Sequence, residues 1–274
     1  MNTFPIKPPS LPHALLAAAL GCVCMIAYAD NTVERARQHG TLVVGMHHVA
    51  PPYVAGAKFR TPESVDSALA ESIAQQMKLQ LTNISVPSKD RAKTLASRKA
   101  DIVLTTIADA APVDKSVVIV LTGYAAGPMA IMRTDTTIKT WEQLKGRKVC
   151  VAGDGRYVGT IAQQYGATEM VFRAPADALL ALRIGTCDAA VHDSTMLEQL
   201  IKLPEWKKFS ARLPVGPVSS LVFAVPANDT HMAGVLKRVA NEWSATGHLK
   251  QLTEKMVRNI AFEVYLDQNV PDCH

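Results

Sequence analysis

Short apolar runs alternate with amphipathic segments along most of this chain, and this alternation constrains its fold more than any other feature. The first series predicts elements in the order βαβαβ, over residues 42–46, 64–77, 79–86, 90–98 and 101–106. Val65, Leu69 and Ile73 recur at the spacing of one helical face. The run Leu42-Val43-Val44 is typical of a parallel strand buried on both faces. The series therefore predicts a doubly wound sheet with right-handed crossovers.

A second series of the same kind starts near residue 128. Its predicted strands and helices lie at 128–132, 141–146, 148–152, 157–165, 170–172, 175–184 and 187–192. Two series predict an α/β protein with two lobes, each a mostly parallel sheet flanked by helices, and a ligand cleft between the lobes. A strand at 221–225 and helices at 231–245 and 247–256 are expected to return to the first lobe. We therefore predict lobe 1 over 30–125, lobe 2 over 126–222, and a return to lobe 1 with C-terminal helices and a tail over 223–274.

The first 29 residues have the features of a secretory signal peptide. An apolar stretch spans 15–26, and Ala27-Tyr28-Ala29 follows as a small-x-small cleavage signal. The apolar stretch is shorter than the roughly 20 residues that a spanning helix needs. We therefore expect cleavage after Ala29 and export to the periplasm. An uncleaved anchor and a lipoprotein modified at Cys22 are the alternatives.

The net charge argues against a nucleic-acid partner and is too small to imply attachment to a membrane surface. Removal of 29 residues from 274 leaves 245, with 28 basic and 24 acidic side chains, because the leader holds Lys7 and no acid. This mild positive charge is spread along the chain, whereas a nucleic-acid-binding domain concentrates it on one face. We expect a monomer, which is usual for two lobes of this size.

Three cysteines remain after cleavage, and two of them lie in predicted buried strands. Cys150 belongs to the strand at 148–152 and Cys187 begins the strand at 187–192. Neighbouring strands lie close to the separation that a disulfide needs, so we predict a Cys150–Cys187 bridge; two buried free thiols are the alternative. Cys273 is left without a partner. The chain has no C-x-x-C pair, and no metal site is expected.

The predicted topology also places the ligand site. In doubly wound sheets ligands bind beyond the carboxyl ends of parallel strands, so the candidate loops follow Met46, Thr106, Ala152 and Val191. His47 and His48 come directly after the first of these strands. Adjacent histidines on an extended chain point in opposite directions and make a poor chelate.

Five segments, in order along the chain, resemble extracellular solute-binding proteins of the amino-acid-binding family 3, which feed ABC importers. They are Gly40–Gly45 with Pro51-Pro52-Tyr53, Asp66 with Leu69–Ala74, Arg91–Asp101, Leu144–Val149, and Ala181–Asp193. The resemblance covers residues 40 to 256. It implies the type II periplasmic-binding-protein fold, a small-molecule ligand, and a membrane permease as partner.

The resemblance also implies particular ligand-binding residues. Asp193 matches the carboxylate that grips a substrate ammonium group, although an aspartate before a helix is also a favoured N-cap. The arginine that clamps an α-carboxylate is absent, because its position after Thr106 falls on Val113 or Asp114. Tyr53 and Tyr124 match aromatic or hinge positions; stacking on a ligand and packing are equally simple interpretations of both.

The loop Gly153-Asp154-Gly155-Arg156-Tyr157 offers a replacement for the missing arginine. Glycines at the start of a helix free backbone N–H groups for an anion, and Arg156 supplies a guanidinium fork. A solvent-facing Arg156 is the alternative. A dinucleotide site is not expected, because Val158 stands where the third glycine of that motif belongs. No cofactor is predicted.

These residues predict a binding protein rather than an enzyme. The expected function is capture of a small polar solute, an amino acid or related compound, with delivery by hinge closure to an ABC importer. A protein that presents its ligand to a sensor receptor is a variant. The alternative is a periplasmic enzyme on the same scaffold, similar to cyclohexadienyl dehydratase, with Asp114 and Asp193 as candidate acids.

Overall fold

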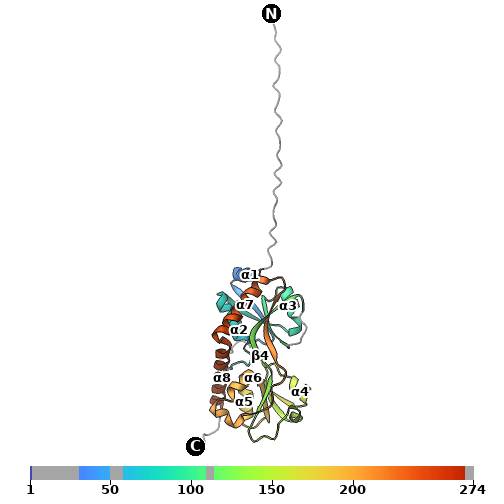
Figure 1. Ribbon diagram of the computed structural model, residues 1–274, viewed down its shortest axis with the longest axis vertical. Coiled ribbons are helices and arrows are strands. Elements are labelled where there is room, and N and C mark those ends of the chain that lie inside the picture. Colours follow the sequence, from blue (N-terminus) through green and yellow to red (C-terminus); the bar gives the residue numbers. More distant parts are fainter. Residues whose placement is uncertain (2–30, 50–57, 109–113, 269–274) are drawn as a thin grey trace.

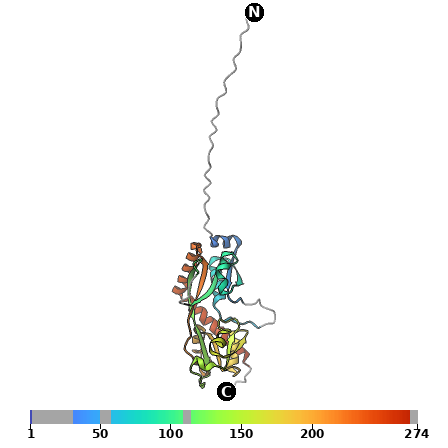
Figure 2. The same cartoon turned by 90° about the vertical axis from the view of Figure 1, so that its right-hand side faces the viewer.

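The computed structural model describes Met1 and residues 31–49, 58–108 and 114–268. Two five-stranded sheets, each flanked by helices, are stacked along the long axis of the molecule (Figures 1 and 2). The predicted two-lobed α/β fold is therefore confirmed. The predicted signal peptide beyond Met1, Tyr53, Cys273 and residues 269–274 lie outside the described residues.

The first sheet has the strand order β2-β1-β3-β10-β4. Its strands are β1 (Thr41–Met46), β2 (Gln80–Ser85), β3 (Ile102–Ala108), β4 (Val117–Ala126) and β10 (Ser219–Pro226). β1 pairs in parallel with β2 and β3, and β10 lies antiparallel between β3 and β4. The accompanying helices are α1 (Thr32–His39), α2 (Asp66–Met77), the short η1 (Ser88–Asp90), α3 (Arg91–Ala96) and α7 (Thr230–Thr246).

The second sheet has the order β7-β6-β8-β5-β9. Its strands are β5 (Pro128–Met132), β6 (Lys148–Ala152), β7 (Thr168–Phe172), β8 (Ala189–Asp193) and β9 (Ala211–Arg212). β6 pairs in parallel with β7 and β8, whereas β5 is antiparallel to β8 and β9. The helices are η2 (Trp141–Leu144), α4 (Thr160–Tyr165), α5 (Pro175–Arg183), α6 (Ser194–Leu200) and η3 (Pro204–Phe209).

Two chain segments cross between the sheets, and they touch at a pair of glycines. The first crossing joins β4 to β5 through Gly127, and the second joins β9 to β10 through Gly216. The Gly216 N–H donates to the Pro128 carbonyl over 2.8 Å. A Cβ on Gly127 would lie 2.6 Å from the Gly216 carbonyl oxygen, which is too close, so this crossing point requires glycine.

The last helix, α8 (His248–Asp267), extends beyond the predicted range of 247–256 and lies along both halves of the molecule (Figure 1). It packs against α7, and it also contacts α5 and α6 beside the second sheet. β10 and α7 do lie with the first sheet. The lobe boundaries given above remain a prediction.

A segment of the first lobe, residues 58–65, connects α8 to the second lobe. Arg60 forms a salt bridge with Asp177 of α5 over 2.8 Å and another with Asp267 of α8. Thr61 donates its N–H and its hydroxyl to Glu263 of α8, over 3.0 and 2.6 Å. The segment therefore joins the last turns of α8 to α5 of the second lobe.

The predicted disulfide is present. Cys150 in β6 is bonded to Cys187, which lies just before β8, and the two Cα atoms are 5.8 Å apart. Both side chains are buried in the core. In the part of the chain that the structure describes, no helix combines the length and apolar character needed to cross a bilayer.

Candidate functional site

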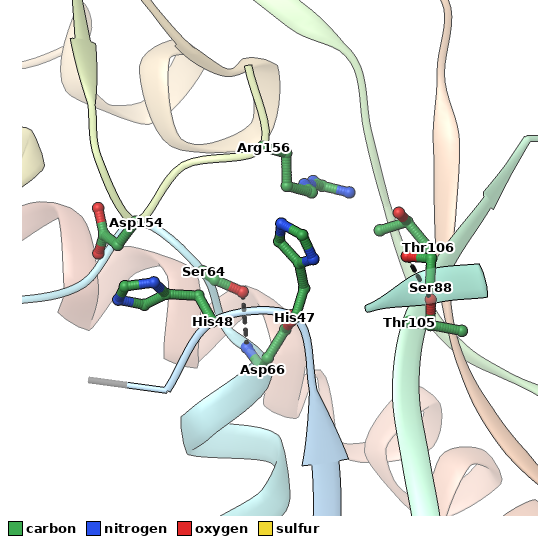
Figure 3. Close-up of a pocket in the computed structure, with 9 residues that line it drawn as sticks. All are labelled: His47, His48, Ser64, Asp66, Ser88, Thr105, Thr106, Asp154 and Arg156. Atoms are coloured by element: carbon green, nitrogen blue, oxygen red, sulfur yellow. Dashed lines mark hydrogen bonds between the residues drawn. The ribbon is translucent and has the colours of Figure 1, made fainter. Parts of the chain in front are cut away.

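A cavity of about 220 Å³ lies between the two lobes (Figure 3). Its first-lobe wall comes from the end of β1, segment 58–65, the start of α2, η1 and β3, and its second-lobe wall comes from the turn after β6. The lining residues are His47, His48, Ser64, Asp66, Ser88, Thr105, Thr106, Asp154 and Arg156. Two of the four loops predicted from topology, those after Met46 and Ala152, supply lining residues, and Thr105 and Thr106 line the cavity from within β3.

Asp193, at the end of β8, is buried beneath this cavity and fully engaged by the protein itself. Its Oδ2 accepts hydrogen bonds from Arg156 Nη2 over 2.6 Å and from the Tyr124 hydroxyl over 2.9 Å. Its Oδ1 accepts from the Tyr157 hydroxyl over 2.6 Å. Asp193 occupies the N-cap position of α6, but its side chain makes no capping hydrogen bond. Its carboxylate therefore holds three side chains around the cleft.

The electrostatics of this cluster follow from burial around one negative charge. Burial lowers the pKa of Arg156, but the charge and hydrogen bond of Asp193, together with the nearby Tyr157 and Tyr124, outweigh this effect and raise that pKa. Burial and then Asp193 raise the pKa of Tyr157 and of Tyr124. Arg156 thus stays charged, and both tyrosines stay neutral donors to Asp193.

Glu63, in segment 58–65, lies beside the loop in which the sequence predicted an anion seat. The N–H groups of Gly153 and Gly155 are not free for an anion, because they donate to the carbonyls of Phe172 and Ala152 over 2.7 and 3.0 Å. Glu63 Oε1 accepts the backbone N–H of Asp193 over 2.9 Å, and its Oε2 lies 2.9 Å from His192 Nδ1. A Cβ on Gly155 would be 2.5 Å from Glu63 Oε2. The role of Gly155 in the structure is to leave room for this carboxylate of the first lobe. The expected helix at 157–165 begins only at Thr160.

Two further carboxylates line the cavity. Burial raises the pKa of both Asp66 and Asp154. Asp154 Oδ2 accepts the Glu63 N–H over 3.0 Å. Asp154 Oδ1 is buried and has no hydrogen-bond partner among the described residues, and the same is true of His192 Nε2. Burial likewise raises the pKa of Glu63, against the opposing effect of His192.

The structure brings together some of the predicted site residues and separates others. Thr106 and Arg156 line the cavity, and Tyr124 and Tyr157 meet at Asp193. Asp114 is exposed just before β4, where its carboxylate accepts the N–H and hydroxyl of Ser116 over 2.9 and 2.8 Å. It is not among the residues that line the cavity.

Sequence reasoning missed Glu63 entirely and gave no role to Asp154 as a side chain. Glu63 comes two residues before Val65 in a stretch that belongs to no helix or strand, so no periodicity marks it. A signal for Asp154 was present, because it lies in the glycine-flanked loop after a strand where ligands are expected. The partners of both residues are distant in the sequence.

Two α/β lobes joined by two crossings, with a polar cavity between them, define a type II binding-protein architecture. The model of the bacterial extracellular solute-binding proteins, family 3, matches residues 42–259. This match covers far more than half of the chain, and the chain belongs to that family. A comparison with curated protein sequences finds no match.

Solved structures with the same fold include several proteins described as binders of amino acids. A mutant of ArgBP from T. maritima is 23% identical and covers 82% of this chain and 98% of that chain, with a TM-score of 0.56. An ancestral cationic amino acid solute-binding protein is 20% identical, covers 83% and 100%, and has a TM-score of 0.59. AbpA from Streptococcus pneumoniae, bound to L-arginine, is 17% identical, covers 83% and 98%, and has a TM-score of 0.56. At these identities the likeness establishes the fold.

Proposed function

We propose that this protein captures a small polar solute, an amino acid or a related compound, in the cleft between its lobes. In this proposal it delivers the solute to an ABC importer in the membrane and carries out no reaction. The site of action is the periplasm, after cleavage behind Ala29. Membership of the solute-binding family supports capture, and several structures of the same fold hold arginine according to their descriptions.

The observation that carries this proposal is that both lobes supply walls of one cavity. His47, Asp66 and Thr106 approach from the first lobe, and Asp154 and Arg156 approach from the second (Figure 3). A solute in this cavity would contact both lobes at once, so binding would favour the closed arrangement over an open one. The cavity is smaller than the roughly 300 to 1,000 Å³ of sites for drug-sized ligands, which suits a compound of amino-acid size.

The internal engagement of Asp193 supports binding rather than catalysis. A general acid or base must reach the reacting group of a substrate, and Asp193 already accepts three hydrogen bonds from protein side chains. Asp114, the other candidate acid, lies outside the cavity lining.

The proposal is tested by a thermal-shift screen against amino acids, polyamines, organic acids and prephenate. At a ligand concentration of about 100 times Kd, binding stabilises the folded state by roughly 2.7 kcal/mol, a shift of a few degrees. A saturable shift with unchanged solute supports capture. Conversion of prephenate, followed by chromatography, would instead establish the enzyme.

The importer partner needs a separate experiment. Membrane vesicles that contain the permease should accumulate the labelled solute only when the binding protein is added. A sensor receptor that responds to the loaded protein, without solute uptake, would replace the importer in the proposal.

A further inference from the structure

The charges around the cavity are arranged in the opposite sense to the one that the family resemblance implies. The resemblance expects a lobe 1 arginine for a ligand carboxylate and Asp193 of lobe 2 for a ligand ammonium group. In the structure the cation, Arg156, stands on lobe 2, and a carboxylate, Asp66, stands on lobe 1. We propose that the solute carries a cationic nitrogen that binds Asp66, and that Arg156 receives its anionic or carbonyl end. This inference rests on the function proposed above.

Asp193 is not available to a ligand ammonium group. Its side chain is 2% exposed, and donors from Arg156, Tyr124 and Tyr157 approach both of its oxygens within 2.9 Å. Its backbone N–H is bound to Glu63. An ammonium group would have to displace the Arg156 guanidinium, which is the charged partner of this buried carboxylate.

Arg156 remains able to bind a ligand because only part of its guanidinium is occupied. The group has five N–H donors, and Nη2 is the one that contacts Asp193. Figure 3 shows the side chain reaching from lobe 2 toward Thr106 of lobe 1, across the cavity. Asp193 fixes its orientation, which favours bidentate recognition of a carboxylate or a pair of acceptors.

Asp66 and Asp154 give the cavity an excess of negative charge. Arg156 pairs with Asp193, and Glu63 lies against His192. Asp66 and Asp154 line the cavity and have no salt-bridge partner within 4.0 Å among the described residues. Asp154 is 9% exposed, and its buried Oδ1 lacks any hydrogen-bond partner in that part of the chain. A bound cation would compensate this charge, whereas a dicarboxylate would be repelled by it.

Asp66 is the better placed of the two carboxylates. It begins α2 on the first lobe, with Ser64 and His47 beside it at the cavity wall. Asp154 already accepts the Glu63 N–H through one oxygen. Because Asp66 and Arg156 belong to different lobes, a compound with a cationic and an anionic end would bridge the lobes directly.

The test measures the affinity of the purified protein and of Asp66→Asn for L-arginine, agmatine, putrescine and succinate by calorimetry. We expect at least one of the cationic probes to bind and succinate not to bind. Loss of one charge-assisted hydrogen bond should weaken binding of the best cationic probe by about 10- to 100-fold in Asp66→Asn. Glu71→Gln, on the exposed face of the same helix, is the matched control and should leave the affinity unchanged.

The outcomes separate this inference from the function on which it rests. Binding of a cationic probe that is lost in Asp66→Asn and kept in Glu71→Gln supports both. Binding of succinate or a neutral solute with the same affinity in Asp66→Asn overturns the inference and leaves solute capture standing. If no compound in this panel or in the wider screen binds, both fail. An unchanged circular dichroism spectrum of Asp66→Asn shows that a lost affinity does not arise from misfolding.

Discussion

The Glu63 carboxylate of the first lobe accepts the backbone N–H of Asp193 in the second lobe over 2.9 Å. The same carboxylate contacts His192. The backbone N–H of Glu63 donates to Asp154 Oδ2. One residue thus ties three positions of the opposite lobe to the first lobe. Glu63 is 2% exposed, so these contacts are shielded from water.

Truncation of Glu63 should destabilise this arrangement of the lobes. In Glu63→Ala the Asp193 N–H and His192 Nδ1 lose their buried partner, and each such loss costs about 1 to 3 kcal/mol. Chemical denaturation should show a loss of that order. Glu198→Ala, at an exposed site on α6, should change the free energy of unfolding by less than about 0.5 kcal/mol. If Glu63→Ala and Glu198→Ala lowered the free energy of unfolding equally, the contacts of Glu63 would not contribute to stability.

Gly155 should tolerate no side chain while Glu63 is in place. The Cβ of Gly155→Ala would stand 2.5 Å from Glu63 Oε2, and overpacking of this kind costs about 1 to 3 kcal/mol. Gly234→Ala in α7 is the matched control, because its Cβ would meet nothing closer than 3.9 Å and alanine favours a helix. The cost of Gly155→Ala should shrink when it is combined with Glu63→Ala, and full additivity in this double-mutant cycle would disprove the clash.

The hydroxyl of Tyr157 should contribute to stability through Asp193. Tyr157→Phe removes the 2.6 Å hydrogen bond to a buried carboxylate oxygen, and a bond to a charged group is worth about 1.5 to 3 kcal/mol. Tyr265→Phe, whose ring is 65% exposed, removes the same atom at the surface and should be close to neutral. A similar melting temperature for both variants would exclude the proposed contribution.

Asp66→Asn should stabilise the ligand-free protein at neutral pH. Burial raises the pKa of Asp66 above its ordinary value of 3.8, so the ionised form is less favourable in the folded state than in the unfolded state. The stability that Asp66 contributes is fully present below about pH 4 and is lost as pH rises through the folded pKa. The variant should therefore melt higher than the natural protein at pH 7, and the difference should narrow below pH 4. A constant difference from pH 3 to pH 8 would refute this assignment.

Removal of the disulfide should cost stability without altering the cavity. Cys150 and Cys187 are separated by 37 positions, and a bridge that closes a loop of that size stabilises by about 2 to 4 kcal/mol. Replacement of both cysteines by alanine should lower the free energy of unfolding by this amount. The natural protein in reducing buffer should have the same free energy of unfolding as the double variant. If reduction leaves the free energy of unfolding of the natural protein unchanged, the bridge does not stabilise the fold.

The architecture was predictable because it depends on local patterns. The strands at 42–46, 128–132 and 148–152 are buried apolar runs, and the structure contains them with small changes at the ends. α1 was not predicted, because this largely polar helix buries only Thr32, Val33 and Ala36. β4 was also absent from the prediction, although its buried and exposed positions alternate over most of its ten residues.

The site was less predictable because it depends on contacts between distant residues. The sequence gives Arg156 and Asp193 separately, but not that they bind each other across 37 positions. The same holds for Glu63 and Asp193, which are separated by 130 positions. Gly155 was predicted to free its N–H for an anion, but this N–H donates to the Ala152 carbonyl. Its lack of a side chain makes room for the Glu63 carboxylate instead.

The position of α8 has a consequence for the way in which the cleft opens. Its first turn approaches α2 through His248, which lies 3.2 Å from Ser72 Oγ, and its last turn holds Arg60, which also pairs with α5. A helix of 20 residues is a stiff rod about 30 Å long. While both ends of this helix stay attached, we expect the lobes to separate by a hinge rotation about an axis along α8. The cleft would then open widest on the side away from α8.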